Sequence, residues 1–179
     1  WRAMKPVICK IHGYAVAGGS DIALCSDMTV MADDAEIGYM PARVWGTPTT
    51  AMWVQRLGPE RAKRMLFTGD RIKGKEAAEI GLVLKSVPLK ELDEYVENLA
   101  ARMASVPVNQ LAMQKMIINQ AMESSGLMEM QRMSTLFDGI SRHSPEGLEF
   151  KRRVDEVGWK KAVAERDEGT YDWTRKKKI

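Results

Sequence analysis

The stretch HGYAVAGGSD, at residues 12–21, carries most of the information about the fold of this chain. It follows the apolar run PVICKI at residues 6–11, whose β-branched residues are typical of a buried strand. After it, residues 22–24 are predicted to be helical and residues 28–32 to form a second strand. Strand, glycine-rich turn, helix and strand in this order predict an α/β fold.

Gly18 and Gly19 stand where the predicted turn meets the predicted helix. A helix N-terminus presents unpaired N–H groups and the positive end of the helix dipole, and glycine lets a ligand oxygen approach them. Such a turn can stabilise an oxyanion, for example the enolate of a thioester. Asp21 would lie in the first helical turn, where a carboxylate can move protons on carbons next to a carbonyl. A structural explanation stays open, because acidic residues also satisfy the unpaired N–H groups of first helical turns.

The composition excludes several classes of protein. The chain has 179 residues, 45% hydrophobic and 28% charged, which is typical of one globular domain. Its net charge of +3 is weaker than a dedicated nucleic-acid-binding protein shows, and no apolar run of about 18 residues predicts a membrane span. Cys9 and Cys25 fit buried free thiols in a reducing compartment, and with only two histidines a Cys/His metal site is not expected.

The second half of the sequence is predicted to be almost entirely helical, because apolar residues recur there at three- and four-residue spacing and prolines stand at helix starts. The expected helices cover residues 89–104, 107–124, 127–141, 144–154 and 159–166. The basic run RKKK follows at residues 175–178, and such a run is usually a solvated chain end.

Several short motifs follow one another in the order found in one enzyme family. They are KPVI at 5–8, HGYA at 12–15, GGSD at 18–21, CSD at 25–27, AEIG at 35–38, QRLG at 55–58, LFTGDRI at 66–72 and AAEIGLV at 77–83. With these motifs the sequence resembles the enoyl-CoA hydratase/isomerase (crotonase) family over residues 5 to about 153. No single motif would be specific, but their combination is.

The resemblance implies a fold, an assembly and a substrate. Family members have a β-β-α spiral core followed by a helical trimerisation region. Residues 1–87 would therefore belong to the core and residues 88–168 to the oligomerisation region, followed by a basic tail at residues 169–179. The implied assembly is a homotrimer or a dimer of trimers, with no membrane or nucleic-acid partner expected. The implied substrate is an acyl-CoA thioester, with no separate cofactor and no metal. The expected compartment of the protein is the cytoplasm, with the mitochondrion as the alternative.

The resemblance also assigns the oxyanion site. Family members hold the thioester oxygen between two backbone N–H groups, one of which maps onto Gly18, while Gly19 shapes the turn. The other N–H belongs to a loop upstream of the segment that begins at Lys5. The chain starts at Trp1 without an initiator methionine or a signal-peptide pattern, so we expect it to be the C-terminal two-thirds of a subunit. We accordingly expect little or no hydratase activity from these 179 residues alone.

Two departures from the family pattern favour a reaction with one base. True hydratases use two glutamates that share a water; the first maps onto Asp21 and the second onto Ala42. Dienoyl-CoA isomerases also have Asp at the first position, but their second acid falls near Thr50. We therefore favour isomerase, hydrolase or other one-base chemistry over two-carboxylate hydration.

Further residues are candidates for substrate binding. Tyr39 and Arg43 lie in or beside the loop that carries the second family glutamate, and Arg43 could hold a carboxylate or phosphate or form a surface salt bridge. Phe150 and Lys151 resemble the family segment that reaches the CoA of a neighbouring subunit. The alternative function is a catalytically impaired CoA-binding or assembly homologue. RNA binding through the tail at 175–178 is a remote option.

Overall fold

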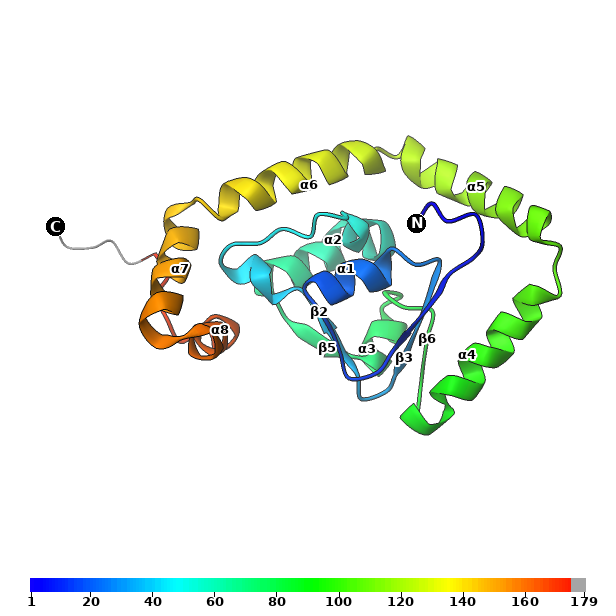
Figure 1. Cartoon of the computed structure of the whole chain (residues 1–179), viewed down its shortest axis with the longest axis horizontal. Coiled ribbons are helices and arrows are strands. Elements are labelled where there is room, and N and C mark those ends of the chain that lie inside the picture. Colours follow the sequence, from blue (N-terminus) through cyan, green and yellow to red (C-terminus); the bar gives the residue numbers. More distant parts are fainter. Residues whose placement is uncertain (175–179) are drawn as a thin grey trace.

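The computed structural model describes residues 1–174 and places two small sheets at the centre of the protein (Figure 1). The first sheet has the order β1-β3-β6, and both of its strand pairs are parallel. It consists of β1 (Ile8–Ile11), β3 (Met28–Ala32) and β6 (Lys85–Val87). Parallel strands need crossover connections, which the intervening helices supply here, and this confirms the predicted α/β class.

The second sheet has the order β2-β4-β5 and carries the turn that opens the first helix. It consists of β2 (Tyr14–Val16), β4 (Glu36–Gly38) and β5 (Arg71–Lys73), with β2 parallel and β5 antiparallel to β4. A Cβ atom at Gly38 would lie 2.5 Å from the carbonyl oxygen of Asp70, so β4 and β5 approach each other this closely only because residue 38 has no side chain.

Three helices from the first half of the chain pack against the two sheets. They are α1 (Gly18–Leu24), α2 (Met52–Thr68) and α3 (Gly74–Glu79), while Met40–Arg43 forms the short 3₁₀ helix η1. The backbone of Gly58 is non-helical (φ 70°, ψ 172°) and Pro59 follows it, so α2 is broken there. The pair Gly58-Pro59 in the sequence predicts an interruption between a helix at 49–57 and one at 60–67, and the break confirms it.

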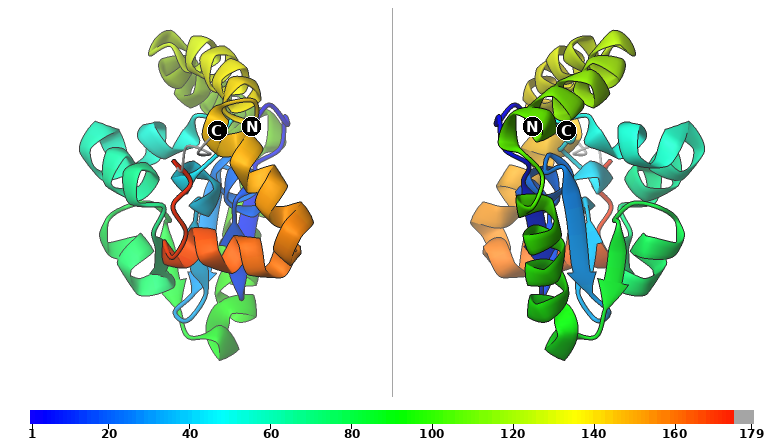
Figure 2. Two further views of the ribbon diagram at one scale, coloured as in Figure 1. Left: turned by 90° about the vertical axis from the view of Figure 1, so that its left-hand side faces the viewer. Right: turned by 90° about the vertical axis from the view of Figure 1, so that its right-hand side faces the viewer.

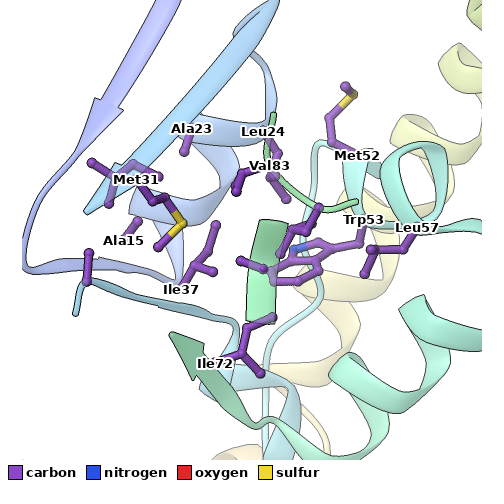
Figure 3. Close-up of a cluster of buried hydrophobic side chains, with 14 of the residues drawn as sticks. Ala15, Ala23, Leu24, Met31, Ile37, Met52, Trp53, Leu57, Ile72 and Val83 are labelled. Atoms are coloured by element: carbon purple, nitrogen blue, oxygen red, sulfur yellow. The ribbon is translucent and has the colours of Figure 1, made fainter. Parts of the chain in front are cut away.

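The hydrophobic core lies between α1, α2 and the two sheets (Figure 3). The indole of Trp53, from α2, lies among Leu57, Val83 and Ile72 in this view, and Ile37 of β4 and Met31 of β3 continue the cluster. Each fully buried side chain of this size contributes about 1.5–3 kcal/mol through removal from water. This burial holds α1 and the start of α2 in fixed positions relative to one another.

The C-terminal helices form an arm that arches over the core (Figures 1 and 2). They are α4 (Leu89–Ala104), α5 (Val108–Ser124), α6 (Leu127–Ser141), α7 (Pro145–Val157) and α8 (Trp159–Glu168). α4 packs beside β1 and β3, α5 and α6 pass over one edge of the core, and α7 and α8 return on the side opposite α4. The arm exposes many apolar side chains on α5 and α6: Met113, Met116, Ile117, Ile118, Met133, Leu136, Phe137 and Ile140.

Several predicted boundaries differ from the structure. α1 begins at Gly18 rather than at residue 22. The sequence pattern at 68–72 predicts a turn, but these residues include β5. The apolar residues 82–84 predict a short strand, which instead forms at 85–87. In residues 1–174 no helix is both long and apolar enough to cross a membrane. The basic run at 175–178 lies outside the described residues. The domain boundaries and the trimerisation role remain predictions.

Candidate active site

A strained turn at Ala17 joins β2 to α1. Ala17 has a φ of 52°, its N–H donates to the carbonyl of Gly38 at 3.1 Å, and its carbonyl accepts the N–H groups of Ser20 (3.0 Å) and Asp21 (3.2 Å). A positive φ at a residue with a side chain costs free energy and persists only where surrounding contacts impose it. These contacts therefore fix the orientation of the first turn of α1.

Open space lies beside this turn. Within residues 1–174, no group accepts a hydrogen bond from the N–H of Gly18 or Gly19, as expected for the first turn of a helix. A Cβ atom added to either glycine would meet nothing within 4 Å. The N–H of Gly18 thus has no partner among these residues, and its role as an oxyanion donor stays a prediction.

Asp21 lies three residues after Gly18, on the lining of a hollow of about 480 Å³. The hollow is formed by Trp1, Val7, Ile8, Cys9, Asp21, Ile22, Cys25, Ser26 and Thr50. Burial raises the pKa of the Asp21 carboxyl above its ordinary value. Hydrogen bonds from the side chain and backbone of Thr50 oppose this shift in the pKa, while the negative charge of Asp138 adds to it. A half-buried carboxylate with a raised pKa is a better proton acceptor than an ordinary aspartate and is suited to acid–base chemistry.

Thr50 is the direct partner of Asp21. Its hydroxyl Oγ1 donates to Asp21 Oδ1 at 2.7 Å across 29 residues of sequence. In the sequence, position 50 is notable only as the place where the second acid of the dienoyl-CoA isomerases falls. In this structure a hydrogen-bond donor stands there instead of a second carboxylate.

Tyr39 lies next to the same group of charges. Its hydroxyl donates to the carbonyl of Thr47 at 3.0 Å, and the side chain is buried. Burial, followed by the negative charges of Asp21 and Asp138, raises the pKa of Tyr39 to about 12. The phenol is therefore neutral at physiological pH and serves as a donor. Its predicted contact with substrate stays a prediction.

Helix α6 contributes two polar residues that the sequence analysis missed. Asp138 Oδ1 accepts the backbone N–H of Thr47 at 3.2 Å, and Gln131 Nε2 donates to the carbonyl of Thr50 at 3.0 Å. Their seven-residue spacing places both on one helix face. That spacing is visible in the sequence, but nothing in the sequence indicated which part of the core this face would meet.

Arg43 takes part in packing rather than in the Asp21 cluster. Its guanidinium donates from Nε to the carbonyl of Arg166 at 2.8 Å and from Nη1 to the carbonyl of Thr68 at 2.6 Å. The side chain also packs closely against Gly69 and Gly169. Arg43 therefore joins the ends of α2 and α8 to η1, which accounts for it without a substrate carboxylate or phosphate.

Phe150 is buried in an aromatic cluster formed by its own chain. It is 1% exposed and stacks on Trp45, with 5.1 Å between ring centroids. Trp159 and Trp173 pack against its other sides at 5.8 and 5.3 Å. The ring is covered by its own chain, and its expected contact with CoA stays a prediction. Lys151 is exposed, and its role stays a prediction.

No group of three or more His, Cys, Asp or Glu side chains in the described part of the chain is placed to hold a metal ion. The absence of a cofactor remains an expectation. The chemistry available at this site is hydrogen bonding from backbone N–H groups and proton transfer by a carboxylate.

Comparisons with known proteins give a consistent result. A family model described as enoyl-CoA hydratase/isomerase matches residues 2–155. A crotonyl-CoA hydratase of Syntrophomonas wolfei is 34% identical over 67% of this chain and 47% of its own length. A mitochondrial enoyl-CoA hydratase of Pongo abelii is 36% identical over 66% of this chain and 42% of its own length. The chain thus spans about half the length of the curated relatives it matches.

Solved structures agree with this comparison. The crystal structure of an enoyl-CoA hydratase from Mycobacterium smegmatis superimposes with a TM-score of 0.90 and 50% identity, covering 94% of this chain and 57% of that one. An enoyl-CoA hydratase/isomerase from Xanthobacter autotrophicus superimposes with a TM-score of 0.85 and 26% identity, covering 96% of this chain and 65% of that one.

Proposed function

The chain belongs to the enoyl-CoA hydratase/isomerase family, and on that premise we propose that it acts on acyl-CoA thioesters by one-base chemistry at Asp21. The observation that carries this proposal is the position of the Asp21 carboxylate. It lines a hollow, in the helical turn that begins with the unpaired N–H groups of Gly18 and Gly19. The acid–base group and the oxyanion donor of Gly18 would thus come from one turn, while the second oxyanion donor is expected from the loop that precedes Lys5 in the family.

The reaction that fits this arrangement is a double-bond shift in an enoyl-CoA. The carboxylate of Asp21 would take a proton from C2 of a 3-enoyl-CoA, and the electrons of that C–H bond would form an enolate. The N–H of Gly18 would stabilise the enolate oxygen. Protonated Asp21 would then return the proton to C4 as the double bond moves to C2–C3, so that no other reactant is needed. The raised pKa of Asp21 favours this transfer, because a carboxyl group with a pKa nearer to neutrality exchanges protons more readily.

Hydration is the second candidate, because the relatives are named hydratases. Against it, η1 carries Ala42 at the position of the second family glutamate. The other acid in this region, Asp138, has Oδ1 bound by the N–H of Thr47 and Oδ2 bound by Arg142. A carboxylate with both oxygens occupied is poorly placed to activate a water. These contacts support the one-base reaction.

The proposal includes an assembly and a compartment. The exposed apolar side chains of α5 and α6 support a homotrimer or a dimer of trimers, since surfaces of this kind mark association sites. The cytoplasm is the proposed compartment, with the mitochondrion as the alternative. A CoA-binding homologue without turnover is the non-enzymatic alternative, and it predicts acyl-CoA binding that does not depend on Asp21.

The experiment compares Asp21→Asn with Asp34→Asn, an exposed acid that serves as a matched control. Because the chain spans about half the length of its relatives, the assay uses a hybrid that also contains the rest of the Mycobacterium smegmatis subunit. A 3-enoyl-CoA should gain the ultraviolet absorbance of a conjugated thioester, and Asp21→Asn should reduce that rate about 10²–10⁴-fold, the usual contribution of an acid–base group. Loss of absorbance from crotonyl-CoA would indicate hydration instead. Turnover unchanged in Asp21→Asn would contradict the proposal.

A further inference from the structure

The segment between η1 and α2 is held in place by helix α6, which passes over it (Figure 1). At one end, Asp138 Oδ1 accepts the N–H of Thr47 at 3.2 Å. At the other end, Gln131 Nε2 donates to the carbonyl of Thr50 at 3.0 Å. These bonds connect residues 91 and 81 positions apart, so they depend on the docking of the arm and not on local sequence.

Thr50 makes one contact through its backbone carbonyl and one through its side-chain hydroxyl. Its carbonyl is bound by Gln131 and its hydroxyl is bound to Asp21. The next residue, Ala51, has a φ of 55°, a conformation that a residue with a side chain adopts only when its neighbours impose it. Within the segment the N–H of Ala51 donates to the carbonyl of Pro48 at 3.2 Å, and from outside it Gln131 supplies the contact at Thr50.

The carboxylate of Asp138 is held by Arg142, the residue that follows α6 directly. Arg142 binds its Oδ2 through Nε at 3.0 Å and through Nη2 at 2.9 Å, and the guanidinium of Arg142 lies over the ring of Trp45 at 4.6 Å. The Asp138 side chain is 15% exposed. With these partners it acts as a hydrogen-bond acceptor and a fixed negative charge next to Asp21, and not as a second base.

We propose that α6 sets the position of the Thr50 hydroxyl against Asp21, with Gln131 and Asp138 as positioning residues of the Asp21 site. The catalytic meaning of this proposal rests on the proposed function, but the positioning itself does not. It makes the helical arm part of the site in addition to a surface for assembly. A purely structural role for these residues would affect stability without changing the protonation of Asp21.

The test follows the carboxyl ¹³C resonance of Asp21 against pH in the 179-residue chain, assigned by comparison with Asp21→Asn. Thr50→Val removes the hydroxyl donor and should shift the titration of Asp21 upward, because hydrogen bonds to a carboxylate lower its pKa. Gln131→Leu should shift it in the same direction, and the double variant should shift it no further than Thr50→Val alone. The titratable and charged groups around this site are Tyr39, Cys25, Asp138, Arg142, Arg56 and the N-terminal amine of Trp1.

Asp138→Asn should produce the opposite shift. It removes a negative charge that raises the pKa of Asp21, while the amide oxygen can still accept the N–H of Thr47. Glu129→Gln removes an exposed charge from the same helix and should leave the titration unchanged. Gln120→Leu, an exposed glutamine on α5, is the matched control for Gln131→Leu.

A titration of Asp21 in Gln131→Leu that equals that of the parent chain would overturn the proposal. Gln131→Ala carries the same expectation and guards against an effect of the leucine side chain. Failure of the proposed function gives a different result. If the hybrid enzyme kept full turnover with Asp21→Asn, the site would not be catalytic, yet the titrations would still decide whether α6 positions Thr50.

Discussion

The ion pair between Lys115 and Asp27 is the main polar anchor of α5 on the core, and its removal should destabilise the protein strongly. α5 buries only Ala112 and Lys115. Lys115 Nζ lies 2.8 Å from Asp27 Oδ2 and 3.3 Å from the carbonyl of Lys5, and Asp27 also accepts the N–H of Val7 at 2.6 Å. The side chains of Lys115 and Asp27 are 9% and 17% exposed, so solvent screens this pair little.

Lys115→Met removes the ion-pair partner of Asp27 and leaves this partly buried charge with the Coulombic attraction of Arg56 alone. Breaking a buried ion pair from one side costs about 3–5 kcal/mol in the free energy of unfolding. Asp27 keeps the N–H of Val7 and some exposure, so we expect the low end of this range, about 3 kcal/mol. That loss corresponds to a change on the order of 10²-fold in the unfolding equilibrium constant.

Urea denaturation followed by circular dichroism measures this loss, and hydrogen exchange shows whether it concentrates in α5 and α6. The double variant Asp27→Asn/Lys115→Met should recover most of the stability, because the neutral amide still accepts the N–H of Val7 without a buried charge. Lys90→Met, at a side chain 83% exposed, is the matched control and should change stability by less than about 0.5 kcal/mol. A loss below about 1 kcal/mol for Lys115→Met, or no recovery in the double variant, would refute the reasoning.

Four further predictions follow from the same structure. Gly74→Ala should lower the free energy of unfolding by about 1–3 kcal/mol, because the added methyl group would overlap the carbonyl of Ala32. Gly18→Ala is the control: its methyl group lies in open space, so thermal stability should stay nearly unchanged. Phe150→Ala should cost about 3–5 kcal/mol and alter tryptophan fluorescence, with Leu148→Ala, at an exposed position on the same helix, as a control that should cost little. Burial raises the pKa of Asp21 in the folded state, so the unfolded chain loses this proton at a lower pH than the folded protein does. The free energy of unfolding should therefore fall as pH rises from the ordinary aspartate pKa to the raised one. Denaturation curves of Asp21→Asn measured over the same pH range should lack this fall. The 179-residue chain by itself should hydrate crotonyl-CoA slowly or not at all, and efficient hydration in an ultraviolet assay would contradict the expected requirement for a second oxyanion donor.

Local patterns predicted the elements that depend mainly on local sequence. β3, α4 and α6 have the predicted bounds, since an apolar β-branched run and long helical periodicity are strong signals. β5 was missed because its three residues form a strand only through pairing with β4. For the same reason β6 lies three residues beyond its predicted start, at the place where it pairs with β3.

The site shows the same division between local and long-range information. Gly18 and Asp21 are three residues apart and lie in the first turn of one helix, so the order of residues alone placed them together. Arg43 was a candidate for ligand binding or for a surface salt bridge because it lies beside the loop of the second family glutamate, and Phe150 because its segment resembles the family's CoA contact. The structure assigns them to packing, since the carbonyls and rings that surround them come from distant segments.

The amino-acid sequence by itself determined the α/β class, the glycine turn and the carboxylate that follows it, because these depend on neighbours within a few residues. Only the tertiary structure decided what faces that carboxylate. Thr50 reaches Asp21 across 29 residues, and α6 reaches the segment that carries Thr50 across more than 80. Such contacts exist because burial of the core fixes α2 beside α1 and the helical arm then docks over both, which no local pattern of residues specifies.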